Sequence, residues 1–275
     1  MATQTSLERV LAVLELFSED RLEWTPEELM ETLGYSRPTL YRYLKTLKEA
    51  GLLTSLPNAG FTLGPKVVEM DYLMRKSDAL VLNGETSLKA LSDRYPCSAL
   101  LVRWYGDKIL CVASTCSTPD PLSSYPRGRP MPLARGAISR AIMAFMPRRQ
   151  LLPMIERNFE ELQDIGLGDT IDAIRARIRQ VKKAGYAVAY GEVTPGVVGV
   201  AAPVFDAAKI PIAAVCVTIA AETFADLDLK DVGAQVKAAA SAISAQLFCE
   251  RSESPGHSAG ADPLGLEAGG PGSRP

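Results

Sequence analysis

The side chains with the clearest chemical potential lie between Ser36 and Lys48. This stretch has four cations, no acid, and interleaved hydroxyl and aromatic groups. Arginine and lysine neutralise DNA phosphates and read guanine edges, while hydroxyl groups add hydrogen bonds to phosphates and bases. We therefore predict a DNA-contacting face formed by Ser36, Arg37, Pro38, Thr39, Tyr41, Arg42, Lys45 and Thr46.

A helix must present this face, and the sequence predicts one over residues 37–50. Leu40, Leu44 and Leu47 fall at i, i+4 and i+7, so one apolar stripe lies opposite the cations. Ser36 is expected to cap the helix, and Gly51 to end it.

A shorter helix precedes it and completes a helix-turn-helix. Thr25 and Glu28 have the spacing of a capping box, Pro26 suits the first helical position, and Gly34 suits the left-handed turn after the last one. By itself this pattern is equally typical of a helical hairpin with a solvated charged face. Residues 52–55 and 61–63 then predict a hairpin directly after the basic helix, which favours a winged helix.

Composition sets outer limits on the protein. The chain has 275 residues, 47% hydrophobic content and a formal net charge of −2, which indicate a globular protein of about two domains. The weak overall charge predicts a focused DNA patch and the help of a second subunit, as a homodimer or homotetramer. No apolar run is long enough for a membrane span, residues 1–6 do not look like a signal peptide, and five cysteines without a CxxC pair fit a reducing cytoplasm.

The predicted architecture is α+β. Residues 1–64 form the winged-helix domain, 65–78 a linker helix, 79–249 a second domain, and 250–275 a disordered tail rich in Gly, Pro and Ser. In the linker helix, Val67, Met70, Leu73 and Met74 form a stripe suited to a partner subunit. The second domain is predicted to have strands at 98–104, 109–114, 186–190, 197–205 and 210–219, and helices at 79–95, 134–145, 149–158, 170–184 and 227–248.

Catalytic readings find little support in the sequence. The only histidine is His257, in the predicted tail, which excludes histidine-based triads and metal sites. The glycines of residues 195–199 are not followed by Gly-Lys-Ser, so they do not form a phosphate loop. We expect no enzyme activity, no cofactor and no metal.

The chain resembles the IclR (isocitrate-lyase-regulator) family of transcription factors over residues 6–249. The matching segments are Leu33–Leu44 in the first domain, and Pro132-Leu133, Arg140–Ala144, Gly185–Ala187, Glu192, Gly196-Val197 and Val200–Asp206 in the second. The resemblance implies a winged-helix DNA reader joined to a GAF-like effector-binding domain, assembled as dimers or tetramers. It also implies a small-molecule effector as a partner, together with double-stranded operator DNA.

The family's effector positions fall on Leu133, Arg135, Gly136, Ala137, Ala189, Glu192, Gly199, Cys216 and Thr218. Several of them have lost the polar group that the family often carries: Ala134 and Gly136 stand for His and Thr, Ala189 for an acid, and Gly199 for Cys. The sequence thus predicts a roomier pocket for a larger organic acid, aromatic or branched, with Arg135 as the partner of its carboxylate. The alternative is that Arg135 is a solvated loop residue.

A redox-sensing regulator without an effector is the other hypothesis, acting through Cys116 or Cys216. Cys111 and Cys216 lie in apolar strand segments, where buried and inert thiols are usual. Cys116 lies in a polar loop, which makes it the reactive candidate.

Overall fold

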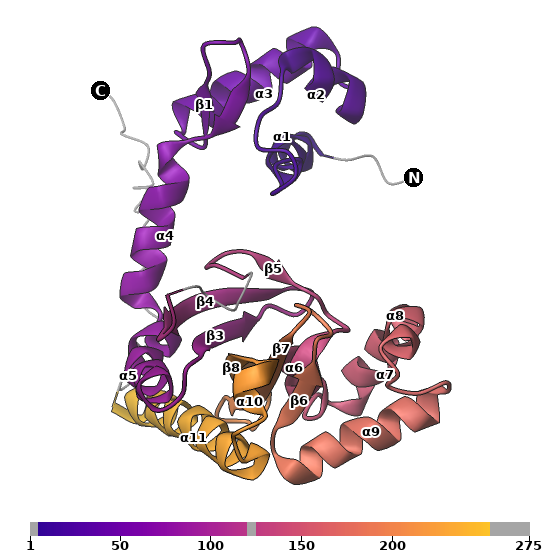
Figure 1. Ribbon diagram of the computed structural model, residues 1–275. Helices are drawn as coiled ribbons and strands as arrows, with labels where there is room; N and C mark the ends of the chain where they lie inside the picture. Colours follow the sequence, from indigo (N-terminus) through magenta and orange to yellow (C-terminus); the bar gives the residue numbers. More distant parts are fainter. Residues whose placement is uncertain (1–4, 120–124, 254–275) are drawn as a thin grey trace, which may run out of the picture. The chain divides into compact units, whose positions relative to one another are not determined.

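The computed structural model describes residues 5–119 and 125–253, and the chain divides into two compact units, residues 1–82 and 83–275 (Figure 1). The first unit contains three helices, a two-stranded hairpin and a fourth helix. These are α1 (Ser6–Glu15), α2 (Pro26–Leu33), α3 (Arg37–Glu49), β1 (Leu53–Ser55), β2 (Phe61–Leu63) and α4 (Pro65–Ser77).

Local sequence signals fix the ends of these helices. The hydroxyl of Thr25 accepts a hydrogen bond from the Glu28 amide at 3.3 Å, and the Thr25 amide donates to the Glu28 carboxylate at 2.9 Å. Gly34 ends α2 with φ +66°, a conformation that costs a glycine little. One expected cap is wrong: Ser36 holds the N-cap position of α3, but its hydroxyl donates to the Thr39 hydroxyl and not to the backbone.

A small core holds the first unit together. Its buried side chains come from all three helices and from the wing: Val13, Trp24, Leu29, Tyr35, Leu40, Tyr43, Leu44, Leu47 and Leu53. The Trp24 amide and carbonyl also pair with Phe61, which attaches the wing to the helical core.

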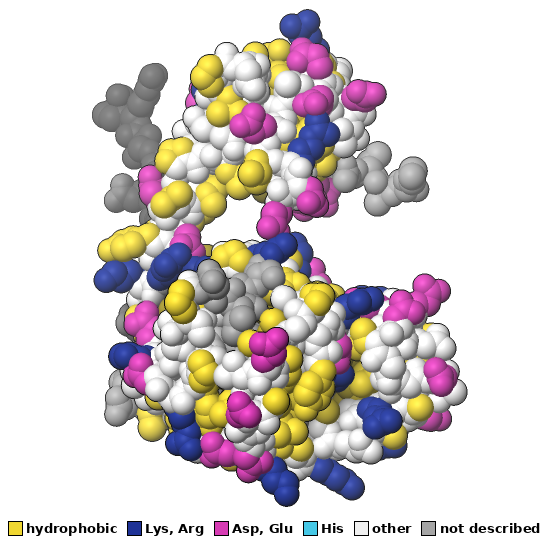
Figure 2. All heavy atoms as spheres, in the orientation of Figure 1, with side chains coloured by type: hydrophobic (Ala, Val, Ile, Leu, Met, Phe, Trp, Pro, Cys, Tyr) yellow, Lys and Arg dark blue, Asp and Glu magenta, His cyan; other side chains and the backbone are white. Residues whose placement is uncertain are grey.

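Helix α4 differs from the other helices of this unit because none of its described residues is buried. Val68, Tyr72, Leu73 and Met74 are between 48% and 72% exposed. Figure 2 shows hydrophobic side chains along α4. Helix α4 occupies the residues of the predicted linker helix, and the described residues leave its apolar surface exposed.

The second unit is built on a six-stranded antiparallel sheet in the order β5-β4-β3-β8-β7-β6. Its strands are β3 (Ser98–Trp104), β4 (Ile109–Cys116), β5 (Pro130–Met131), β6 (Ala187–Tyr190), β7 (Val197–Phe205) and β8 (Pro211–Ala220). Its helices are α5 (Ala79–Arg94), α6 (Gly136–Met143), α7 (Arg148–Arg157), α8 (Phe159–Asp164), α9 (Ile171–Ala184), α10 (Ala221–Phe224) and α11 (Leu229–Glu253). The α+β class predicted from the sequence is confirmed.

Helices cover both faces of this sheet (Figure 1). On one face Leu101 of β3 packs beside Gly84 of α5 and near Ile243 of α11. On the other face Leu100 and Cys216 join a core with residues of α6, α7 and α9. Strand register places Leu100 opposite Cys216 and Gly199 opposite Thr218, so this second face gathers residues distant in sequence.

Helices α5 and α11 are also joined through polar groups. The Tyr95 hydroxyl donates to the Asp231 carboxylate at 2.6 Å, and the Arg94 guanidinium donates to it at 3.1 Å. These hydrogen bonds, Tyr95 first and then Arg94, lower the pKa of Asp231.

Several elements differ from the sequence prediction. Helix α6 begins at Gly136 and not at residue 134, because the backbone of Arg135 is extended and Gly136 has φ +86°. Helices α8 and α10 and strand β5 were not predicted. Strand β4 continues to Cys116, so the prediction that Cys116 lies in a loop is wrong. Helix α11 continues to Glu253, so the expected disorder of residues 250–253 is wrong, and the rest of the expected tail lies outside the described residues.

Candidate DNA-binding face and effector cavity

Helix α3 has one buried and one exposed side. Leu40, Leu44 and Leu47 are at most 2% exposed, as the stripe predicted, and Tyr43 is buried beside them. The Tyr43 hydroxyl lies 3.3 Å from the Ser6 hydroxyl, which joins α1 to α3. This anchoring fixes which side of α3 is available to a partner.

The predicted DNA-contacting residues lie on the available side. Thr39 is half-buried, and the others are exposed: Ser36, Arg37, Pro38, Tyr41, Arg42, Lys45 and Thr46. The Arg37 guanidinium lies 5.5 Å from the Tyr41 ring centre, and Lys45 meets Glu49 at 3.8 Å in an exposed pair. Exposed pairs of this kind are weak, so the cations remain able to meet phosphates.

The wing adds a second wall next to this helix. A groove is lined by Tyr41, Leu44, Lys45, Lys48, Glu49 and Phe61, the last from β2. A cationic helix flanked by a hairpin is the arrangement that places side chains in a major groove and a wing beside it.

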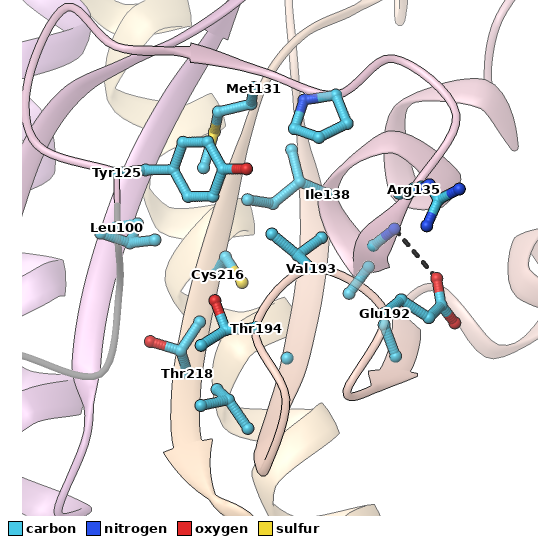
Figure 3. A pocket seen from close by; sticks show the side chains of 16 residues that line it. Leu100, Tyr125, Met131, Arg135, Ile138, Glu192, Val193, Thr194, Cys216 and Thr218 are labelled. Atoms are coloured by element: carbon cyan, nitrogen blue, oxygen red, sulfur yellow. Dashed lines mark hydrogen bonds between the residues drawn. The ribbon is translucent and has the colours of Figure 1, made fainter. Parts of the chain in front are cut away.

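The second unit contains a cavity between the sheet and the start of α6 (Figure 3). About 550 Å³ of space free of protein atoms lies within its outline, and this figure includes open solvent. The lining residues are Leu100, Tyr125, Met131, Pro132, Arg135, Gly136, Ala137, Ile138, Ala189, Glu192, Val193, Thr194, Val197, Gly199, Cys216 and Thr218.

The structure brings together all but one of the predicted effector residues. Leu133 is not among the lining residues; it packs against the neighbouring core, and its carbonyl accepts a hydrogen bond from the Ser139 hydroxyl. The sequence analysis missed several apolar lining residues, including Leu100, Met131 and Ile138. Strand alternation could have found Leu100, which pairs with Cys216, but no sequence signal placed the others at the cavity.

Gly136 occupies a tight position in the cavity wall. A side-chain carbon added there would lie 2.9 Å from Val193, and the positive φ of Gly136 already disfavours other residues. Glycine in place of the threonine that the family often carries here therefore fits the local packing, because the loop with Val193 packs closely on the start of α6.

A buried ion pair holds that loop to α6. Glu192 accepts a hydrogen bond from the Gly136 amide at 3.0 Å and another from the Arg140 guanidinium at 2.7 Å. Arg140 also donates to the Val188 carbonyl at 2.6 Å, and its side chain is only 9% exposed. Arg140 and Glu192 matched the family pattern in the sequence, but their pairing was not predicted.

Arg135 is paired as well. Its Nε donates to the Glu161 carboxylate of α8 at 2.7 Å, with both side chains more than a third exposed. Arg135 is thus partly exposed and paired with Glu161 through its Nε, and its contact with an effector carboxylate stays a prediction.

The cysteines fall into two kinds. Burial raises the pKa of Cys97 to about 12 and of Cys111 to about 11, and it raises that of Cys216 even further. At Cys116, burial also acts to raise the pKa, but hydrogen bonds with Ser98 and Thr118 together outweigh it and lower the value. Cys116 is therefore the thiol with the greater thiolate character.

Within residues 5–119 and 125–253, no cluster of three or more potential ligands would suit a metal ion. Over the same residues no helix combines the length and hydropathy of a membrane span.

The two sites define a class of protein: a winged-helix DNA-binding module joined in one chain to an α/β module with an internal cavity. Comparisons with known proteins narrow this class. Residues 6–57 match the IclR helix-turn-helix domain, and residues 80–245 match the family described as bacterial transcriptional regulator IclR C-terminal. The chain belongs to the IclR family of DNA-binding transcriptional regulators.

Individual relatives agree with this assignment. The HTH-type transcriptional regulator XynR of Escherichia coli (strain K12) is 26% identical over 244 residues, which cover 88% of this chain and 96% of that protein. The Pca regulon regulatory protein of Pseudomonas putida is 26% identical over 215 residues, 78% of this chain and 74% of that protein.

Solved structures share the fold. An IclR homologue from Microbacterium hydrocarbonoxydans, crystallised with 4-hydroxybenzoate, is 18% identical with a TM-score of 0.70, and the match covers 89% of this chain and 100% of that one. A transcriptional regulator from Rhodococcus sp. RHA1 is 24% identical with the same TM-score of 0.70, over 90% of this chain and 100% of the other.

Proposed function

We propose that this regulator binds a DNA operator through α3 and that a small organic effector in the cavity controls this binding. The observation that carries the proposal is the cavity itself, whose lining is mostly apolar with a few hydroxyl groups. Small-molecule sites have this composition, because apolar walls supply affinity and sparse polar groups supply orientation.

On the DNA side, Arg42 and Lys45 are the side chains expected to contribute most. Both are exposed on the side of α3 opposite its buried leucines. An arginine that meets a guanine edge supplies base discrimination, whereas a lysine on a phosphate supplies affinity that salt weakens.

Operator binding by a homodimer, or by a tetramer built from dimers, is part of the proposal. Each chain offers one short basic helix, and residues 5–119 and 125–253 leave an apolar stripe on α4 exposed, with Leu73 60% exposed. A second copy would cover such a stripe, and two copies would present two reading helices to a near-palindromic site. Footprinting with a protein that sediments as a monomer, yet protects the full operator, would contradict this.

For the effector, the sequence predicts an organic acid anchored by Arg135. In the structure such an acid must compete with Glu161, which lies 2.7 Å from the Arg135 Nε. A ring compound suits the apolar lining, and 4-hydroxybenzoate, the molecule bound to the Microbacterium homologue, is a practical first probe.

A redox-sensing regulator is the second candidate, and exposed Cys116 with its lowered pKa is the observation in its favour. Cys216 does not support it, because burial keeps that thiol protonated. Operator binding that is unchanged after peroxide treatment, and equally unchanged in Cys116→Ser, would remove this candidate.

The central test is a thermal-shift screen of small organic compounds, followed by operator titrations with and without each hit. A ligand that binds only the folded protein raises its unfolding temperature by mass action. Hits should change operator affinity in the unmodified protein. A variant with a filled cavity, Gly199→Leu, should lose the ligand response and keep basal DNA binding. Ligands that bind without changing operator affinity would contradict control by this cavity.

A further inference from the structure

We propose that the effector of this protein is an uncharged, largely apolar molecule that carries a hydroxyl or amide N–H group, and not a carboxylate. This inference rests on the proposed function, because it assigns a chemical class to the ligand of the same cavity. It follows from three features of the lining: its charge pairing, the start of α6, and the polarity of the floor.

First, the positive charge near the cavity is already matched. Among the described lining residues, the only charged side chains are Arg135 and Glu192. Arg135 is paired with Glu161, and Glu192 is paired with Arg140 behind the wall. A ligand carboxylate would therefore enter a site with no excess of positive charge, and its desolvation would go uncompensated.

Second, the place where a carboxylate would bind most readily is occupied by the protein's own. The amides at the start of a helix attract anions. At the start of α6, Glu192 accepts from the Gly136 amide, as the dashed line in Figure 3 shows. A ligand anion would have to displace Glu192 from both Gly136 and Arg140, or lie beside a like charge.

Third, the floor of the cavity offers acceptors. The Thr218 hydroxyl donates its proton to the Ser98 carbonyl at 3.3 Å, so its oxygen is left to accept. The Cys216 thiol is directed to the Val217 carbonyl at 3.5 Å. Such a floor favours a ligand that donates a hydrogen bond, and a carboxylate has no proton to give.

The rest of the lining is mostly apolar, apart from the hydroxyl groups of Tyr125 and Thr194. Figure 3 shows Met131, Ile138 and Val193 around the space above Cys216, while Arg135 lies apart from them, near Glu192. A ring or branched hydrocarbon body fits these walls, and burial of its apolar surface supplies most of the affinity.

The test is a matched series in which only the head group changes: 4-hydroxybenzoate, 4-hydroxybenzamide, 4-hydroxybenzyl alcohol and 4-hydroxybenzylamine. Calorimetry with the full chain at neutral pH should show the amide and the alcohol binding about tenfold or more tightly than the anion, a difference of about 1.4 kcal/mol or more. The cationic amine should also be weaker than the neutral members. Tighter or equal binding of the benzoate or of the amine overturns the inference.

A variant sharpens the result. Glu192→Gln removes the resident carboxylate and leaves Arg140 without its charge partner, so 4-hydroxybenzoate should gain about tenfold while the amide changes by less than about twofold. Glu160→Gln on α8 makes the same charge change at an exposed position outside the lining, and it should alter neither affinity. A benzoate affinity that does not respond to Glu192→Gln overturns the proposed role of Glu192.

The unmodified protein gives an independent measurement. If only the uncharged acid enters, the affinity for 4-hydroxybenzoate should rise as pH falls toward the pKa of its carboxyl group, while the affinity for the amide stays constant. A flat profile for the benzoate overturns the inference. If no member of the series binds and none changes operator affinity, both this inference and the proposed effector control fail. If the benzoate anion binds more tightly than the neutral members, only this inference fails, and effector control by the cavity stands.

Discussion

The two units of this protein use arginine in opposite ways. On α3, Arg37 and Arg42 are exposed and rest near aromatic rings, 5.5 Å and 5.4 Å from their centres. At the cavity, Arg135 and Arg140 are each held by a carboxylate at 2.7 Å. The first pair remains available for an external anion, whereas the second has found its anions within the chain.

This difference shows that a cation near a candidate site is not by itself evidence for an anionic ligand. What matters is whether folding has already supplied the counter-charge. The exposed arginines predict a polyanion as partner. The arginines at the cavity already have a carboxylate of the chain as their counter-charge.

The largest effect is expected from breaking the buried pair. Arg140→Met leaves the carboxylate of Glu192, only 14% exposed, without its cation, and should destabilise the second unit by about 3 kcal/mol or more. Trp24 and Trp104 are the only tryptophans and lie one in each unit. Denaturant unfolding in a Trp24→Phe background therefore reports on the second unit through Trp104.

The matched control for this prediction removes both charges. Arg140→Met combined with Glu192→Leu should recover much of the lost stability, because no unpaired charge is left buried. A single Arg140→Met variant that unfolds at the same denaturant concentration as the unmodified protein would mean that this arginine is solvated, and the contrast between the two units would disappear.

An intermediate effect is expected from the exposed arginines. Arg42→Ala should weaken operator binding by about 1–3 kcal/mol and relax discrimination at one base pair, while leaving the stability of the first unit unchanged. Titration at fixed salt measures the loss. Lys89→Ala on α5 removes the same charge from outside α3 and should bind the operator normally; equal losses in both variants would point to net charge alone.

The smallest effect is expected where the exposed carboxylate of Asp231 meets exposed Arg94 and the hydroxyl of buried Tyr95. Because the pKa of Asp231 is lowered in the folded state, its contribution to stability is present above the unfolded pKa of about 4 and is lost as pH falls through the folded value. Asp231→Asn should be slightly less stable at neutral pH and match the unmodified protein in acid. Thermal unfolding across this range checks it, and a constant difference at every pH would contradict it.

The sequence predicted well what local signals determine. The capping box of Thr25 and Glu28, the turn at Gly34 and the leucine stripe of α3 all depend on neighbours within one or two helical turns. The same holds for the exposed side of α3, because burial of one stripe fixes the opposite side.

It predicted poorly what only tertiary structure brings together. Arg140 and Glu192 are 52 positions apart, and Arg135 and Glu161 are 26 apart. Neither pairing leaves a periodic pattern in the sequence. The prediction that Arg135 binds a ligand carboxylate assumed that no carboxylate of the chain lies beside it. Glu161 does lie beside it, on α8, a helix that was not predicted.

The attachment of Glu192 to the start of α6 also links the stability of the second unit to the shape of the cavity. Val193 and Thr194 follow Glu192 directly and form part of the cavity wall, so the hydrogen bonds from Gly136 and Arg140 to Glu192 also position that wall. Under the proposed function, a substitution that breaks the pair of Glu192 and Arg140 would therefore change ligand binding and the stability of the unit together.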